Sequence, residues 1–136
     1  HHPPTAILSG LVGSEMCIRD SEKSGAITIF IGVARSKGKK DKEVKTLVME
    51  SYEEHANRTI NQICKEVNKK FKTNFVTICH FIGEFETGEP IVFAAVGGKH
   101  RKESFLALEE AVERYKKEPA LFKKEVYLDG TQKWMN

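Results

Sequence analysis

From Gly25 onward, the chain alternates between stretches with a hydrophobic period of two residues and stretches with a period of 3.6 residues. The first period is typical of β-strands and the second of amphipathic helices. Strands are predicted at residues 26–33, 44–52, 75–82, 90–96, 121–127 and 133–134. The order is β-β-α-β-β-α-β-β, with strands in pairs between the helices. Paired strands favour an antiparallel or mixed sheet with two main helices packed on it, so an α+β fold is expected and a doubly wound parallel fold is not.

The two helices are predicted from stripes of apolar residues at helical spacing. The first stripe consists of Ala56, Ile60, Ile63, Cys64, Val67 and Phe71. The second consists of Phe105, Leu108, Ala111, Val112 and Tyr115. Pro119 is expected to end the second helix soon after Lys117, because proline cannot continue a helix. Ser51 and Glu54 have the spacing of a capping box before the first helix, and the alternative is that Ser51 ends the preceding strand.

Composition excludes several classes of protein. The chain has 136 residues, 40% of them hydrophobic, which fits one domain with one core. Its longest apolar runs, 26–34 and 91–96, are far shorter than the roughly 20 residues that a membrane-spanning helix needs. A net charge of +3 is too small to indicate nucleic-acid binding. The 3 cysteines include no Cys-x-x-Cys pair, which argues against a disulfide framework or a zinc site and favours a reducing cytoplasm.

Residues 1–23 are expected to be a non-native or disordered segment, and residues 24–136 a single domain. The apolar stretch 6–12 has no basic residue before it, so a signal peptide is not expected. The run 13–21 resembles a translated adapter sequence. This segment is therefore not expected to carry function, and any strand that the natural N-terminus supplies is expected to be missing.

Two groups of basic residues are candidates for an anion site. His100 and Arg101 open the second helix directly after a buried strand, where free amides and the helix dipole favour an anion. A solvated helix start explains the same spacing equally well. Lys116 and Lys123 flank Pro119, so their ammonium groups can converge on one pocket and act as acid, base or nucleophile. Solvated surface is the more common explanation for such lysines.

Other polar residues are expected to be structural. The carboxylates Glu84, Glu86 and Glu89 lie on the connection 83–89, whose two glycines suit a hairpin, so a hydrated turn is expected. His80 is in register with apolar strand residues, which favours a core or interface histidine. Cys64 and Cys79 are interpreted as small core residues. No spacing of metal-ligating residues indicates a metal site, and no cofactor is expected.

Several segments, in the same order and spacing, resemble the large, catalytic subunit of molybdopterin synthase. Residues 80–89 have the pattern His-x-Ile-Gly-Glu-x-x-x-Gly-Glu, and 99–102 resemble that family's helix-opening His-Arg motif. Residues 122–125 resemble its Trp-Lys-Lys-Glu motif, with Phe in place of Trp. The resemblance covers about residues 24–134.

The resemblance implies an α/β-hammerhead fold and a cytoplasmic sulfurtransferase. In that family the catalytic subunit is a homodimer with a small ubiquitin-like sulfur carrier at each end, which makes a heterotetramer. The carrier's C-terminal Gly-Gly thiocarboxylate enters a pocket and donates sulfur to cyclic pyranopterin monophosphate. Two transfers form the dithiolene of molybdopterin.

The resemblance also implies roles for particular residues. Arg35, His100 and Arg101 match residues that bind the substrate phosphate or pterin, some of them across the dimer interface. Lys123 matches a catalytic lysine, with Lys116 as its partner. An alternative register gives Lys117 and Lys124. The first register is preferred because Phe122 then replaces the aromatic residue and Glu125 keeps its place.

Two other functions are kept as alternatives. An α+β domain with basic edges can bind single-stranded RNA, but that function needs exposed aromatic residues on central strands. Phe75, Phe81 and Phe93 lie in apolar contexts instead. The other alternative is a non-catalytic dimer of the same fold, against which the two lysines and the His-Arg pair argue.

Overall fold

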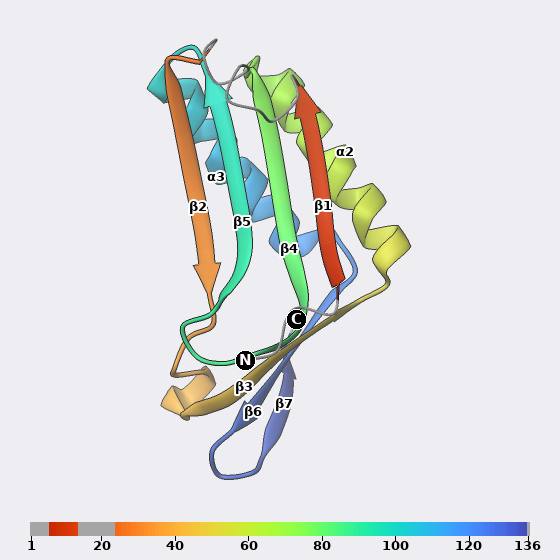
Figure 1. Ribbon diagram of the computed structural model, residues 1–136, viewed down its shortest axis with the longest axis vertical. Coiled ribbons are helices and arrows are strands. Elements are labelled where there is room, and N and C mark those ends of the chain that lie inside the picture. The colour runs from red at the N-terminus through yellow and green to blue at the C-terminus, as the bar shows by residue number, and fades with distance from the viewer. Residues whose placement is uncertain (1–5, 14–23, 136) are drawn as a thin grey trace.

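The computed structural model describes residues 6–13 and 24–135 (Figure 1). Within them lie seven strands, two α-helices and a short 3-10 helix at Lys39–Asp41. The strands are β1 (Ala6–Gly13), β2 (Ala26–Val33), β3 (Val44–Ser51), β4 (Phe75–Phe85), β5 (Pro90–Gly98), β6 (Leu121–Tyr127) and β7 (Gln132–Met135). The helices are α2 (Glu53–Phe71) and α3 (Arg101–Lys117). The predicted α+β class is confirmed, and all the strand pairs are antiparallel.

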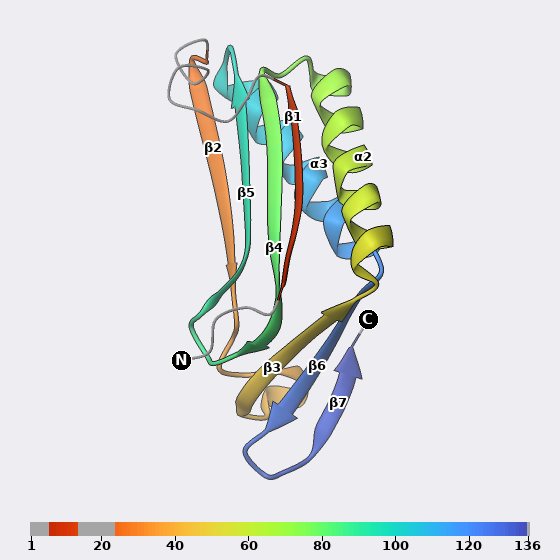
Figure 2. The same cartoon turned by 45° about the vertical axis from the view of Figure 1, so that its right-hand side comes forward.

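The sheet has two parts, which we call the main sheet and the small sheet. The main sheet has the order β2-β5-β4-β1, and the small sheet has the order β3-β6-β7. They are joined because β4 is long: its residues 75–82 pair within the main sheet and its last residues, Gly83–Phe85, pair with β3. Figure 2 shows the small sheet crossing below the end of the main sheet. The junction therefore gathers the ends of elements that are distant in sequence.

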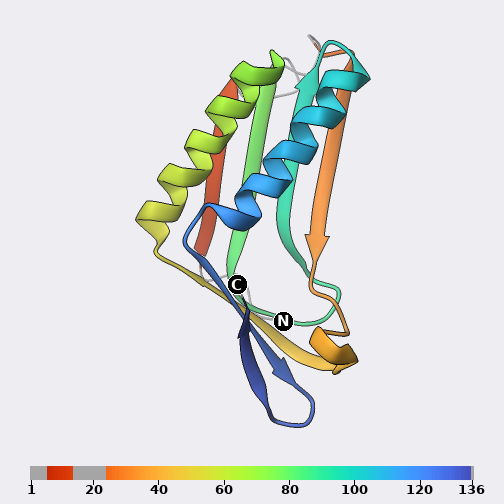
Figure 3. The ribbon, with the colours of Figure 1, turned by 180° about the vertical axis from the view of Figure 1, so that it is seen from behind.

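Both helices pack on the same face of the main sheet (Figure 3). The fully buried side chains of α2 are Ala56, Ile60, Ile63, Cys64 and Val67, as the first stripe predicted. The helix α3 presents smaller residues to the sheet, among them Ala107 and Ala111. Its Ser104 is fully buried and lies 3.2 Å from the hydroxyl of Thr28 on β2. None of the described helices is both long and apolar enough to cross a membrane.

The opposite face of β2 is apolar and exposed. Ile27, Ile29, Ile31 and Val33 each keep about half of their surface accessible, 47–57%. These residues alternate with Thr28 and Phe30, which point toward α3, so the period-2 pattern of the strand has apolar residues on both sides. Such a strand is expected to have a second covered face.

Two local predictions are wrong, and the structure decides between two alternatives at a third position. The capping box at Ser51 does not form: α2 is preceded by Tyr52, and the Ser51 hydroxyl has no hydrogen-bond partner among the described residues. Ser51 instead ends β3, as the alternative stated. Phe105 is 60% exposed, because the buried stripe of α3 runs through Ser104 and Ala107. Gly83 lies inside β4, so the hairpin loop begins only after Phe85.

Part of the N-terminal segment, which is expected to be non-native or disordered, forms a strand. Residues Ala6–Gly13 form β1, which pairs with β4 from Ile82 to Phe75 along the side not occupied by β5. The rest of the segment 1–23 lies outside the described residues. The main sheet therefore has a fourth strand that the pattern from Gly25 onward does not contain.

Candidate functional site

A cavity of about 220 Å³ lies where α3 and the main sheet meet the small sheet. Residues from six elements line it: β3, β4, β5, α3, β6 and β7. The lining residues are Met49, His80, Ile91, Tyr115, Lys116, Leu121, Lys123 and Met135. The cavity thus has a mostly apolar wall and two lysines. A pocket of this kind concentrates electrostatic interactions because its wall excludes water.

Lys123 is held in this wall by β-sheet pairing. It lies on β6 between Met49 of β3 and Met135 of β7, and its side chain is half-buried. Burial lowers the pKa of the Lys123 ammonium, and the nearby charges of Arg35 and Lys116 lower it further, while Glu125 opposes them. A lysine in this environment releases its proton more readily than a solvated one.

Lys116 is exposed, and it lines the same cavity from the last turn of α3. Its Nζ lies 6.0 Å from the ring centroid of Phe30 on β2, and the neighbouring Tyr115 ring packs 6.5 Å from that ring. The helix ends one residue later, and Pro119 then turns the chain into β6. Lys116 and Lys123 therefore line one cavity from the two sides of the proline break, which is the less common of the two explanations that the sequence offers.

The residues of the alternative register lie elsewhere. Lys117 is exposed and makes an ion pair with Glu113 at 3.8 Å on the surface of α3. The Nζ of Lys124 lies 5.1 Å from the centroid of the Trp134 ring. Neither side chain lines the cavity described above.

Arg35 joins the site through a smaller hollow beside the cavity. The hollow is lined by Val33, Arg35, Val44, Leu47, Lys123 and Glu125, so Lys123 belongs to both. Glu125 is 3% exposed, and the hydroxyl of Tyr127 donates a hydrogen bond of 2.8 Å to its carboxylate. A Cβ atom at Gly38 would collide with this carboxylate, so glycine allows the loop after Arg35 to approach it closely.

His100 and Arg101 lie at the opposite end of α3. His100 is the residue before the helix, where its side chain and that of Glu103 form a capping box with the backbone. Both His100 and Arg101 are exposed. The helix has 17 residues, so roughly 25 Å separates this end from Lys116 at 1.5 Å per residue. Within one chain, the structure does not bring the His-Arg pair to the two lysines.

His80 is the cavity residue that sequence reasoning missed. The prediction of a core histidine is confirmed, because the side chain is 2% exposed and packs edge-on against Tyr115 at 5.7 Å. Burial lowers the pKa of its ring to about 4. The alternation of residues along the strand shows which face of the sheet His80 occupies. The cavity at the end of that face forms only where the small sheet meets the main sheet, so the sequence around His80 does not predict it.

The remaining polar groups have structural surroundings. Cys64 is fully buried, and burial raises the pKa of its thiol to about 12, so it is not a nucleophile. Burial also raises the pKa of Cys79. In the described part of the chain, no cluster of three or more His, Cys, Asp or Glu side chains could hold a metal ion.

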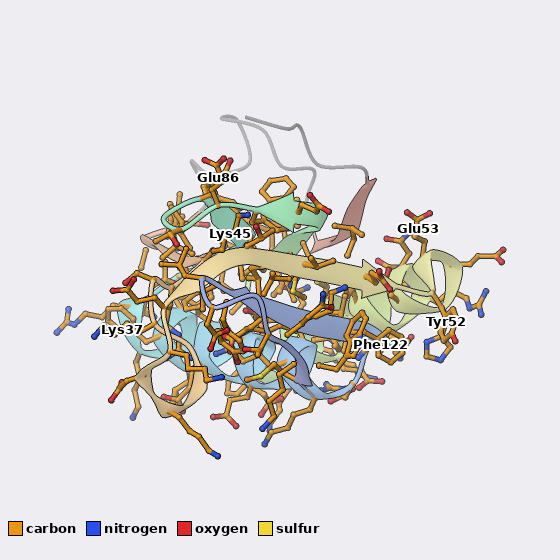
Figure 4. All side chains as sticks on the ribbon, turned by 90° about the horizontal axis from the view of Figure 1, so that it is seen from below. Lys37, Lys45, Tyr52, Glu53, Glu86 and Phe122 are labelled. Atoms are coloured by element: carbon orange, nitrogen blue, oxygen red, sulfur yellow. The ribbon has the colours of Figure 1, made fainter. Side chains whose placement is uncertain are left out.

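Phe122, which takes the place of a tryptophan in the motif 122–125, lies at the rim of the small sheet. Its ring is 37% exposed and packs edge-on against Tyr52 at 5.5 Å. Figure 4 shows the two rings side by side, with Lys37 beyond the other end of β3. The substitution keeps an aromatic residue next to Lys123.

Comparison with known proteins identifies the family. The sequence model of the MoaE protein family matches residues 11–118. The molybdopterin synthase catalytic subunit of Bacillus subtilis is 37% identical over 123 residues, which are 89% of this chain and 78% of that protein. Catalytic subunit 1 of Aedes aegypti is 36% identical and covers 90% of this chain and 75% of its own.

A solved structure agrees. Molybdopterin synthase from Staphylococcus aureus superposes with a TM-score of 0.78 at 33% identity, over 85% of this chain and 82% of that one. This likeness confirms the fold that the resemblance implied. The chain therefore belongs to the MoaE protein family, the catalytic subunits of molybdopterin synthase, which are transferases of molybdenum cofactor biosynthesis.

Proposed function

We propose that this chain transfers sulfur from the C-terminal thiocarboxylate of a small carrier protein to cyclic pyranopterin monophosphate, forming the dithiolene of molybdopterin. The observation that carries the proposal is the convergence of Lys116 and Lys123 on one partly apolar cavity. Arg35 lies beside Lys123 and adds a third positive charge.

The chemistry of the reactants suits this cavity. The donor tail is a thiocarboxylate anion and the acceptor carries a cyclic phosphate, so both bring negative charge. Attack on a carbonyl or a phosphorylated carbon also develops negative charge in the transition state. Positive groups that are already in place stabilise such charge without reorganising, which is the largest single contribution in many enzymes. Lys123 is half-buried in the cavity wall, and Lys116 lies exposed at its edge. In this proposal Lys123, whose pKa is lowered mainly by burial, transfers protons, and Lys116 stabilises the developing anion.

We assign the binding of the substrate phosphate to Arg35 of this chain together with His100 and Arg101 of a second copy. The second copy is needed because one chain does not bring its own His100 and Arg101 to the cavity. A two-fold axis perpendicular to the strands would place the partner's end of α3 level with the lysines of the first chain. The exposed apolar residues of β2, from Ile27 to Val33, suit the interface of such a homodimer.

The carrier partner is proposed to be ubiquitin-like, with a C-terminal Gly-Gly segment that reaches the cavity. A Helicobacter pylori structure of the same fold is described as a complex of subunits 1 and 2 of molybdopterin-converting factor. One carrier at each end of the homodimer gives a heterotetramer, without nucleic acid or membrane. A cytoplasmic location is part of the proposal, and the free thiols of Cys64 and Cys79 suit its reducing conditions.

The test is a reconstitution from purified components. The full chain is mixed with a thiocarboxylated carrier and cyclic pyranopterin monophosphate, and molybdopterin is assayed by the fluorescence of its oxidised derivative. Product that requires all three components supports the proposal. A folded chain that binds the carrier and yields no product would favour the alternative of a non-catalytic dimer.

A further inference from the structure

His80 is a cavity residue to which the function proposed above gives no task. It lies on β4, where it pairs with Val92 of β5, and its side chain is 2% exposed. The cavity that it lines is the one that Lys116 and Lys123 share. Burying a polar ring costs free energy unless its nitrogen atoms have partners, so the presence of a histidine at this position calls for an explanation.

The hydrogen bonding of the ring fixes its tautomer. The Nδ1 atom lies 3.0 Å from the carbonyl oxygen of Phe81. A carbonyl oxygen only accepts hydrogen bonds, so Nδ1 carries the hydrogen and donates it. In the neutral ring Nε2 is then an unprotonated acceptor. The Tyr115 ring packs edge-on against the imidazole and restricts its rotation.

The other polar groups of the cavity offer no comparable acceptor. Lysine ammonium groups donate hydrogen bonds and accept none, so Lys123 becomes an acceptor only after it has released a proton. Burial raises the pKa of the Tyr115 hydroxyl to about 12, so it keeps its proton. The rest of the wall is apolar, consisting of Met49, Ile91, Leu121 and Met135. A nitrogen with a free lone pair is therefore a distinct feature of this wall.

The sulfur transfer itself needs a base. The sulfur of a thiocarboxylate is bonded to an acyl carbon, so once it bonds to the pterin it joins the carrier and the pterin as a thioester. Release requires water to attack the acyl carbon, and water is a poor nucleophile unless a base removes its proton.

We propose that His80 is this base: its Nε2 takes the proton from the water molecule that cleaves the acyl–sulfur bond between carrier and pterin. The inference rests on the proposed function and deepens it. A bond forms between the water oxygen and the acyl carbon, and the bond from that carbon to sulfur breaks. The proton on Nε2 passes to the departing thiolate. The carrier leaves as a carboxylate, and its second proton goes to solvent.

The surroundings of His80 suit this cycle. Burial lowers the pKa of the ring to about 4, so it is neutral at neutral pH, as a base must be. The bond from Nδ1 to the Phe81 carbonyl orients the ring, as the second partner of a catalytic histidine commonly does. The ammonium groups of Lys116 and Lys123 in the same cavity oppose the imidazolium that forms during the step, and the anionic groups of the bound reactants offset them.

The experiment compares His80→Asn with the parent chain in a single turnover. The amide nitrogen of asparagine can replace Nδ1 and keep the bond to Phe81, while Nε2 is lost. The carrier is quenched in acid at successive times, and its mass reports any attached pterin. His55→Asn is the matched control, because His55 is an exposed residue in the first turn of α2. Carrier affinity and urea unfolding check that each variant is folded.

We expect His80→Asn to hydrolyse the thioester about 100-fold more slowly, within the usual contribution of a general base, and to accumulate the carrier–pterin adduct. His55→Asn should match the parent chain. Turnover of His80→Asn within threefold of the parent would overturn the role, and so would a loss of product without adduct. A parent chain that forms neither adduct nor product would overturn the sulfur transfer itself, which separates the two failures.

A second variant keeps the test decisive if His80→Asn does not fold. His80→Ala leaves space in the cavity for an added imidazole molecule. Imidazole that restores hydrolysis of the accumulated adduct supports a base at this position. Adduct hydrolysis that proceeds in His80→Ala at the parent rate without imidazole contradicts it.

Discussion

The main sheet with its helices and the small sheet with its cavity are built on opposite principles. Where α2 and α3 cover the main sheet, the interior consists of aliphatic side chains such as Ile60, Ile63 and Ile78, which are fully buried. At the junction with the small sheet, the chain instead half-buries Lys123 and buries Glu125 and His80. The apolar interior of the main sheet and its helices stabilises the fold. The junction with the small sheet instead holds polar and charged side chains in a place where burial costs free energy.

This difference teaches which residues should matter for what. A buried aliphatic side chain contributes stability through burial and packing, and its loss leaves a cavity. A desolvated ammonium contributes little stability, because leaving water costs free energy. Under the proposed function, its placement is explained by the reaction that it would support. Substitutions in the two regions should therefore separate stability from activity.

The largest effect is expected at Lys123. Lys123→Ala should slow product formation about 1,000-fold, or ~4 kcal/mol, within the range for removing a group that transfers protons. Carrier affinity and urea unfolding should change little, because the lost charge is not part of the apolar core. The assay is single-turnover formation of molybdopterin. Lys124→Ala, one residue along the same strand, should stay within threefold, and an equal loss there would contradict the assignment.

In the main region, by which we mean the main sheet with α2 and α3, a substitution is expected to change stability and not activity. Ile63→Ala should lower the free energy of unfolding by about 3 kcal/mol, since a fully buried side chain is truncated. The activity of each folded molecule should remain. Urea unfolding at a fixed protein concentration measures the first quantity, and Lys65→Ala on the exposed side of α2 is the control. A strong loss of activity in folded Ile63→Ala would mean that the two regions are not separable.

Lys116 and Lys117 sharpen the comparison within one helix turn. Lys116→Ala should slow product formation about 100-fold, since its charge lies at the cavity. Lys117→Ala should have almost no effect, because that side chain lies on the helix surface beside Glu113. Parallel rate measurements on the two variants decide the register. The reverse result would move the catalytic pair to Lys117 and Lys124.

Arg101 tests whether the two ends of the molecule cooperate across a dimer. Arg101→Ala should weaken substrate binding about 10-fold, as expected for a hydrogen bond to a charged group, and change carrier affinity far less. Titration of each ligand separately measures this difference. Mixed subunits of Arg101→Ala and Lys123→Ala should recover about a quarter of the active sites, because each mixed dimer then holds one intact site. No recovery after subunit exchange would place Arg101 in its own chain's site.

The main region was largely predictable from sequence, for a physical reason. Its strands and helices bury one face each, so burial repeats with the period of the backbone, as in the stripe from Ala56 to Val67. Phe105 shows where this reasoning fails. In the first half of α3 the residues against the sheet, Ser104 and Ala107, are small, and Phe105 beside them is 60% exposed. Its exposure depends on how closely this part of the helix approaches the sheet.

The candidate site was predictable only in part. Lys116 and Lys123 flank a proline that forces the chain to turn, so their convergence has a local cause that sequence carries. The cavity does not, because its wall combines Met49, His80 and Met135 from three strands that meet only through the crossing of the small sheet. Strand β1 was missed because the segment that contains it was set aside on the appearance of its sequence.

The smallest expected effect concerns charges on the outside of the main region. Arg114 of α3 makes two hydrogen bonds to Glu118, at 2.6 and 2.9 Å, and one to Glu66 of α2 at 2.7 Å. Arg114→Ala should lower the free energy of unfolding by about 1 kcal/mol, the upper range for surface pairs, because the bonds are bidentate and link the two helices. Lys117→Ala, which removes only a single exposed pair at 3.8 Å, should be near neutral in the same urea titration.

The effect of Arg114→Ala should shrink when salt is added, whereas that of Ile63→Ala should not, because salt screens exposed charges and leaves apolar burial in place. An Arg114→Ala loss as large as that of Ile63→Ala, and equally insensitive to salt, would mean that surface charge holds the helices together and that the contrast between an apolar region and a charged one is wrong.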